Sequence, residues 1–173
     1  QSEAIEALKE IIAQPSFRMP FDIFREHLYS AEDLYKGYLP GKPLTFKECY
    51  DQQVYQHYLK AGKSATEIKE TLARTLHDHS MTNAMNDFLT HFDEKQVVGI
   101  MGGHGLLRTE KSYQQIVLIS KRLTENGCLM ISGGGPGAME ATHLGAWMAG
   151  RTEEEVTKAI NLLKEAPSFK DKS

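Results

Sequence analysis

The chain has 173 residues, 40% of them hydrophobic and 25% charged, which is the composition of one or two globular domains rather than of a disordered segment. Its net charge of −3 gives no electrostatic reason to expect nucleic acid or an anionic membrane as a partner. No apolar stretch reaches the roughly 20 residues that span a bilayer. Cys49 and Cys128 form no metal or redox motif, so a reducing cytoplasm is the simplest location.

Residues 1–93 have the pattern of an all-helical domain. Apolar residues recur at helical spacing near its start and again near its end. These residues are Ile5, Leu8, Ile11 and Ile12 in the first stretch and Met81, Met85, Phe88 and Phe92 in the second. Ser30, Thr45 and Ser64 each stand three residues before an acidic residue, and each predicts the start of a helix. Gly62 is predicted to terminate a helix in a left-handed conformation.

Four acid and imidazole side chains near the end of this region invite a metal-site hypothesis. They are His77, His79, His91 and Asp93. Side chains two positions apart on a helix point to different faces, so His77 and His79 make a poor chelate. No metal site is predicted.

Residues 94–173 change to an α/β pattern. The apolar run 97–101 is typical of a strand buried on both faces of a parallel sheet, and a helix is predicted over residues 112–125. A second strand is predicted over residues 128–132, followed by a helix that begins near Pro136. Thr152 and Glu155 form a capping box that opens a further helix over residues 151–164. This β-α-β-α order is the start of a doubly wound, Rossmann-like parallel sheet.

No third strand is predicted within the 173 residues. Two parallel strands alone leave hydrophobic edges and a face uncovered. We therefore expect strands from further sequence, or from a second copy of the chain, to complete the sheet, and further sequence is the favoured source.

The stretch ISGGGPGAMEAT over residues 131–142 places four glycines and a proline between a strand and a helix. Such a turn lets an anion reach backbone amides at the positive end of a helix dipole. A tight turn that binds no ligand is the alternative. The segment is not a Walker loop, since no Lys-Ser or Lys-Thr pair follows. It also lacks the acid that should follow a dinucleotide-binding pattern at the end of the next strand. The predicted phosphate-binding residues are Gly133, Gly134, Gly135, Pro136, Gly137, Ala138 and Met139.

The pair MGGHG (residues 101–105) and ISGGGPGAMEA (residues 131–141) resembles the LOG-type, lysine-decarboxylase-like branch of Rossmann proteins. That branch includes cytokinin-activating phosphoribohydrolases and nucleotide 5′-monophosphate nucleosidases. The resemblance covers residues 95–150 and implies a homo-oligomer that binds a nucleoside monophosphate. In its complete form, such a protein would use water, with no cofactor, to cleave the bond between base and ribose 5-phosphate. The alternative is a nucleotide sensor without catalysis, since the branch's PGGxGTxxE motif does not occur in these residues.

The resemblance also assigns a role to the first glycine turn, and two charged residues nearby are interpreted from their own chemistry. Gly102, Gly103 and His104 would lie beside the base or ribose, although His104 is open to interpretation as an ordinary loop histidine. Arg108 is either a phosphate partner or a surface charge. Glu140 either stabilises the start of its helix or accepts a ribose hydroxyl.

Overall fold

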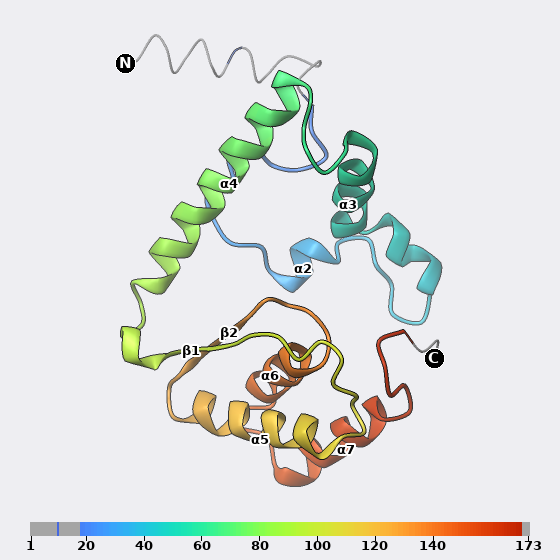
Figure 1. Cartoon of the computed structure of the whole chain (residues 1–173), viewed down its shortest axis with the longest axis vertical. Coiled ribbons are helices and arrows are strands. Elements are labelled where there is room, and N and C mark those ends of the chain that lie inside the picture. Colours follow the sequence, from blue (N-terminus) through green and yellow to red (C-terminus); the bar gives the residue numbers. More distant parts are fainter. Residues whose placement is uncertain (1–9, 11–17, 171–173) are drawn as a thin grey trace. The chain divides into compact units, whose positions relative to one another are not determined.

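The structure is a computed structural model that describes residue 10 and residues 18–170 (Figure 1). The chain divides into two compact units, residues 1–90 and residues 91–173, and this boundary lies three residues before the predicted one. The helix predicted around residues 5–12 lies outside the described residues, Glu10 apart. None of the described helices combines the length and the apolar composition that crossing a membrane requires.

The described part of the first unit consists of helices and loops. Its elements are α2 (Ala31–Leu34), the 3₁₀ helix η2 (Pro43–Glu48), α3 (Tyr50–Ala61) and α4 (Ile68–Leu89). The helix start predicted at Ser30 is confirmed, because the Ser30 hydroxyl accepts a hydrogen bond from the Asp33 amide at 3.1 Å. Gly62 ends α3 with φ +88°, the left-handed conformation that was predicted for it.

Two of the predicted helix starts in this unit are wrong. Thr45 lies inside η2, where its hydroxyl donates to the Lys42 carbonyl at 2.7 Å instead of capping a new helix. Ser64 lies in a loop and caps no helix. Helix α4 begins at Ile68, four residues after Ser64. The reason is a tertiary contact, since Arg74 Nη1 donates to the carbonyl of Gly62 at 3.1 Å and holds this loop against the side of α4.

The second unit has the predicted β-α-β-α order and is a mixed α/β unit. Its elements are η3 (Glu94–Gln96), β1 (Val97–Ile100), α5 (Lys111–Glu125), β2 (Leu129–Ser132), α6 (Ala138–Trp147) and α7 (Glu153–Leu163). The two strands are parallel, with Val97 opposite Leu129 and Ile100 opposite Ser132. The capping box predicted at Thr152 is confirmed, since both of its hydrogen bonds with Glu155 are present.

The core of this unit lies between its helices. Its buried members are Tyr113 and Val117 of α5, Ala141 of α6, and Val156 and Ile160 of α7. Helices α5 and α6 approach closely at Gly145, where a Cβ would lie less than 3.0 Å from the Val117 carbonyl oxygen. The absence of a side chain at Gly145 lets α6 lie close to α5.

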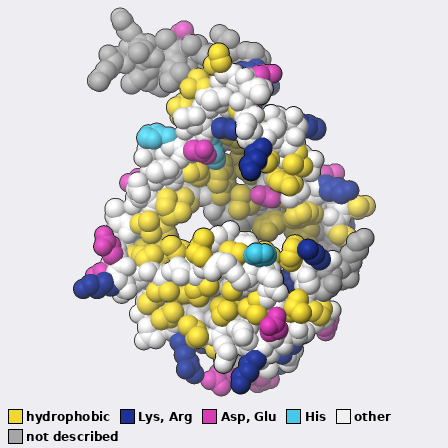
Figure 2. Space-filling model, in the orientation of Figure 1, with side chains coloured by type: hydrophobic (Ala, Val, Ile, Leu, Met, Phe, Trp, Pro, Cys, Tyr) yellow, Lys and Arg dark blue, Asp and Glu magenta, His cyan; other side chains and the backbone are white. Residues whose placement is uncertain are grey.

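The two strands are not buried on both faces, contrary to the prediction. Helices α5 and α6 lie on the same side of the strands (Figure 1), and Met130 on that side is 7% exposed. The next residue, Ile131, faces the other way and is 41% exposed, and Met101 beyond β1 is 74% exposed. Figure 2 shows apolar side chains at the surface of this unit. A two-stranded sheet covered on one side leaves its second face accessible.

Candidate functional site

Two glycine turns are in backbone contact at the carboxyl ends of the parallel strands. One follows β1 and contains Gly103, with φ +65°, and the other follows β2 and contains Gly137, with φ +74°. A Cβ on Gly137 would lie less than 3.0 Å from the Gly103 carbonyl oxygen, and a Cβ on Gly103 would lie 2.6 Å from the Ala138 Cβ. Both positions therefore require glycine, for backbone conformation and for space.

The contact between the turns uses part of their hydrogen-bonding capacity. The Gly103 carbonyl accepts from the Ala138 amide at 3.2 Å, and the Gly134 amide donates to the Ser132 hydroxyl at 3.1 Å. The amides of Met139 and Glu140, second and third in α6, have no intrahelical acceptor because they lie in the first turn. With the positive end of the helix dipole, these two amides are what the start of α6 offers to an anion.

Pro136 does not belong to the first turn of α6, contrary to the prediction. The helix begins at Ala138, and its N-cap is Gly137 with φ +74° and ψ −123°. Since the chain must pass the Gly103 backbone immediately before the helix, a glycine occupies the cap and Pro136 lies in the preceding turn.

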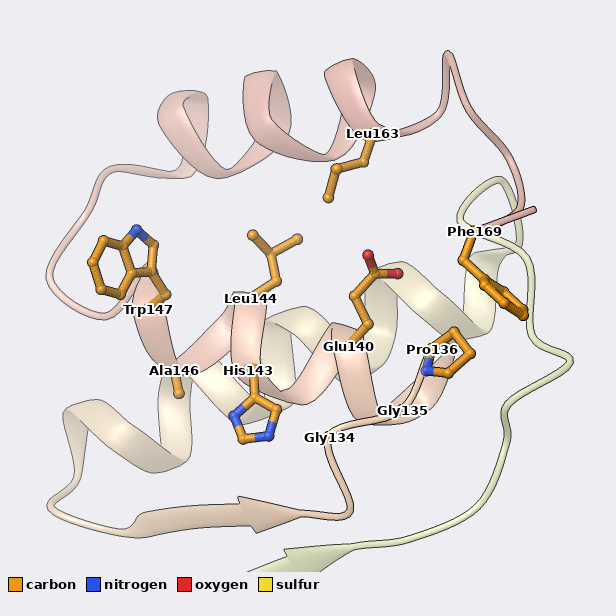
Figure 3. Close-up of a pocket in the computed structure, with 10 residues that line it drawn as sticks. All are labelled: Gly134, Gly135, Pro136, Glu140, His143, Leu144, Ala146, Trp147, Leu163 and Phe169. Atoms are coloured by element: carbon orange, nitrogen blue, oxygen red, sulfur yellow. The ribbon is translucent and has the colours of Figure 1, made fainter. Parts of the chain in front are cut away.

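A cavity of about 870 Å³ runs along α6 from the second glycine turn (Figure 3). Gly134, Gly135 and Pro136 form one end of it, and Trp147, 84% exposed, stands at the other. Between them Leu144 of α6 and Leu163 of α7 point toward one another. Its volume is in the range of small-molecule sites, and it combines an apolar wall with the start of a helix.

A second, smaller cavity of about 280 Å³ shares Pro136, Glu140 and Phe169 with the first. His104, Arg108 and Gly137 also line it. The smaller cavity therefore brings together five of the predicted site residues, and Gly134 and Gly135 of the larger cavity make seven.

Five of the twelve predicted residues line neither cavity, namely Gly102, Gly103, Gly133, Ala138 and Met139. Gly102, with φ +79°, is exposed and lines neither cavity. Ala138 is buried in the contact between the turns. The side chain of Met139 covers the turn, and its sulfur would lie 3.3 Å from a Cβ on Gly133.

Arg108 and Glu140 form an ion pair across the two segments, an arrangement that neither interpretation from the sequence included. Arg108 Nη2 donates to Glu140 Oε1 at 2.6 Å, and Nε donates to Oε2 at 3.0 Å. The side chains are 16% and 28% exposed. This hydrogen bonding from Arg108 to the carboxylate raises the pKa of Arg108. Arg108 Nη1 also donates to the Ala166 carbonyl at 2.8 Å, which fixes the segment after α7 beside the site.

Sequence reasoning missed the pairing of Ser132 with His143. The Ser132 hydroxyl lies 2.7 Å from His143 Nε2 and links the end of β2 to the middle of α6. His143 also lines the larger cavity (Figure 3). A signal was present, because Glu140, His143, Leu144 and Trp147 follow helical spacing and so share one face of α6.

Comparisons of the chain with models of protein families, with curated proteins and with solved structures find no match.

Proposed function

We propose that the second unit binds a nucleoside 5′-monophosphate, with the turn from Gly133 to Met139 holding the phosphate. The observation that carries this proposal is the contact of the two glycine turns in front of the start of α6. In open parallel sheets, ligands bind beyond the carboxyl ends of the strands, which is where these turns lie.

The electrostatics of the turn are compatible with a phosphate. The amides of Met139 and Glu140 belong to the first helical turn, and the only side chain close to Gly135 is the flexible end of Met139, which can move aside for an approaching oxygen. The carboxylate of Glu140 alone would repel a phosphate. Arg108 neutralises it through hydrogen bonds to both of its oxygens, which leaves the positive end of the helix dipole to attract the anion.

The two cavities give the rest of the nucleotide two places to lie. The smaller one, beside His104, suits the placement of ribose and base that the family resemblance implies. The larger one offers the apolar wall of Leu144 and Leu163, against which a base could pack. Trp147, the sole tryptophan of the chain, lines the larger cavity, so its fluorescence reports whether the base binds there or in the smaller cavity.

Hydrolysis of the N-glycosidic bond is proposed only for the complete form of the protein. Cleavage through an oxocarbenium-like transition state calls for a carboxylate beside the sugar. Among the described residues that line the two cavities, Glu140 is the carboxylate, and Arg108 holds both of its oxygens. Because its oxygens are already hydrogen-bonded, Glu140 is not free to stabilise the sugar. This favours the alternative function for the 173 residues alone, a nucleotide-binding module without catalysis.

We further propose that the α/β unit is part of a Rossmann-like sheet that additional strands complete, from further sequence or from a second copy in a homo-oligomer. The accessible face at Ile131 and Met101 supports this, since hydrophobic strands of a parallel sheet are normally covered on both sides.

Calorimetric titration tests the function. AMP, GMP, CMP and UMP are titrated into the protein beside the four matching nucleosides, and free base is assayed in the same samples. We expect at least one monophosphate to bind roughly tenfold or more tightly than its nucleoside, because charge-assisted hydrogen bonds from the turn reach only the phosphate. Equal affinities for nucleoside and nucleotide contradict the proposal. Quenching of Trp147 on binding places the base in the larger cavity, and unchanged emission places it beside His104.

A further inference from the structure

The first unit contains a cavity of about 380 Å³ between α3 and α4 that is independent of the glycine turns. One wall is a stripe of charged and imidazole side chains on α4, at positions 70, 74, 77 and 78. The other walls are Val54, His57 and Tyr58 of α3, the ring of Phe21, and Lys63 from the loop between the helices. Apolar rings and charged groups thus face one small space.

Glu70 is a buried carboxylate at the centre of this wall. It is 7% exposed, accepts from Arg74 Nε at 2.8 Å and lies 2.9 Å from His57 Nε2. Burial alone would raise the pKa of Glu70, but these hydrogen bonds hold it below its ordinary value. A buried ion network of this kind stabilises a fold no better than apolar packing does, so its presence in a cavity wall calls for a role.

Each of the two imidazoles that line the cavity is held through one of its own ring nitrogens. His57 uses Nε2 with Glu70, and His77 Nδ1 lies 2.7 Å from the Asp22 carbonyl oxygen. The Phe21 ring lies edge-on to both, with centroids 6.2 Å and 5.3 Å away. Each ring therefore has a fixed orientation and one nitrogen left over.

Three polar groups that line the cavity make no hydrogen bond or ion pair among the described residues. Arg74 Nη2 is buried and unbonded, although the other two nitrogens of that guanidinium donate to Glu70 and to loop carbonyls. The ammonium of Lys63 and the carboxylate of Asp78 form no ion pair within the described part of the chain. The Lys63 and Asp78 charges are exposed to water, whereas the donor on Arg74 is buried, and buried donors without acceptors are rare in native proteins and point to a missing partner.

We propose that this cavity binds a small zwitterion of the amino-acid type. With Glu70 neutralised by Arg74, the cavity presents one unpaired cation, Lys63, one unpaired anion, Asp78, and the unbonded donor of Arg74. A carboxylate on the ligand pairs with Lys63 and accepts from Arg74, and an ammonium group pairs with Asp78. An inorganic phosphate would match the first pair but leave Asp78 to repel it, and a simple amine would leave Lys63 and Arg74 unpaired.

Calorimetry with the twenty L-amino acids on the full chain tests this proposal. For the tightest binder, the matching deaminated acid and decarboxylated amine are titrated as well, and inorganic phosphate is the competitor. We expect the amino acid to bind roughly tenfold or more tightly than either analogue. Absence of binding by every amino acid, equal binding by an analogue, or displacement by phosphate at comparable concentration overturns the assignment.

Variants locate the site. Lys63→Met and Asp78→Asn, both at exposed positions, should each weaken binding by roughly tenfold, with unchanged helical content by circular dichroism. Lys47→Met and Asp87→Asn are the matched controls, because Lys47 and Asp87 are exposed residues of the same unit outside the cavity. Wild-type affinity in Lys63→Met or Asp78→Asn, or equal loss in the controls, contradicts the proposal.

Discussion

Replacing Gly137 by alanine should separate the two glycine turns. The substitution adds a methyl group where the backbone has φ +74°, and the new Cβ would meet the Gly103 carbonyl at less than 3.0 Å and the His104 Cα at 3.2 Å. Because these neighbours are backbone atoms, they move only if the first turn moves as a whole. The hydrogen bond from the Ala138 amide to Gly103 is lost in that movement.

The expected cost has three parts. A left-handed conformation costs a non-glycine residue about 1–2 kcal/mol. The lost hydrogen bond contributes about 0.5–1.5 kcal/mol, and the steric displacement of a packed segment adds about 1–3 kcal/mol. Together they predict that Gly137→Ala lowers the stability of the second unit by about 2.5–6.5 kcal/mol. Gly134→Ala is the matched control, since Gly134 also has a positive φ, of +71°, but no atom lies within 4 Å of its Cβ position.

Hydrogen exchange of the α6 amides measures this difference. Mass spectrometry of peptides that span residues 138–147 reports the second unit without a contribution from the helices of the first. The control should lose about 1–2 kcal/mol, the cost of the backbone conformation alone. Equal protection of α6 in Gly137→Ala and Gly134→Ala would refute the contact between the two turns.

Three further outcomes are expected. Gly145→Val should lower the free energy of unfolding by about 3 kcal/mol or more, because its side chain would meet the Val117 carbonyl, and a melting temperature within a degree of the wild type would contradict this. Glu140→Gln should cost about 1–3 kcal/mol by leaving Arg108 without its anion, and adding Arg108→Met should recover part of that loss in a double-mutant cycle. Glu70 has a lowered pKa despite its burial, so its stabilisation is complete at neutral pH and is lost as pH falls below about 4.3. Acid unfolding followed by circular dichroism should therefore show a weaker pH dependence in Glu70→Gln, and an unchanged dependence would exclude the carboxylate as the cause.

The order of elements in the second unit could be predicted because its signals are local. Apolar runs before glycines locate β1 and β2 within a residue of the structure, and the capping box at Thr152 depends only on Glu155, three residues away. The same kind of pattern failed at Ser64. There Arg74, ten residues later, holds the loop by its carbonyls, and tertiary contact outweighs local capping.

The features of the candidate site likewise divide into those that local sequence signals predict and those that depend on tertiary packing. The need for glycine at Gly103 and Gly137 is visible in the sequence, since each follows a strand end and few other roles need so many glycines. The pairing of Arg108 with Glu140 is not visible, because 32 residues separate them and only the packing of the first turn on α6 brings them together. The accessible sheet face also depends on which strands are present, which no local pattern reports.

Calorimetric titration of AMP, GMP, CMP and UMP into Gly135→Asp and Gly135→Asn tests whether the turn from Gly133 to Met139 holds a phosphate. The two side chains are nearly isosteric, and at either one the Cβ meets only the flexible end of Met139, at 2.5 Å. We expect Asp to weaken binding of the monophosphates by roughly tenfold or more relative to Asn, because its negative charge would lie beside that of the phosphate. Equal affinity of the two variants for every monophosphate that the wild type binds would contradict it.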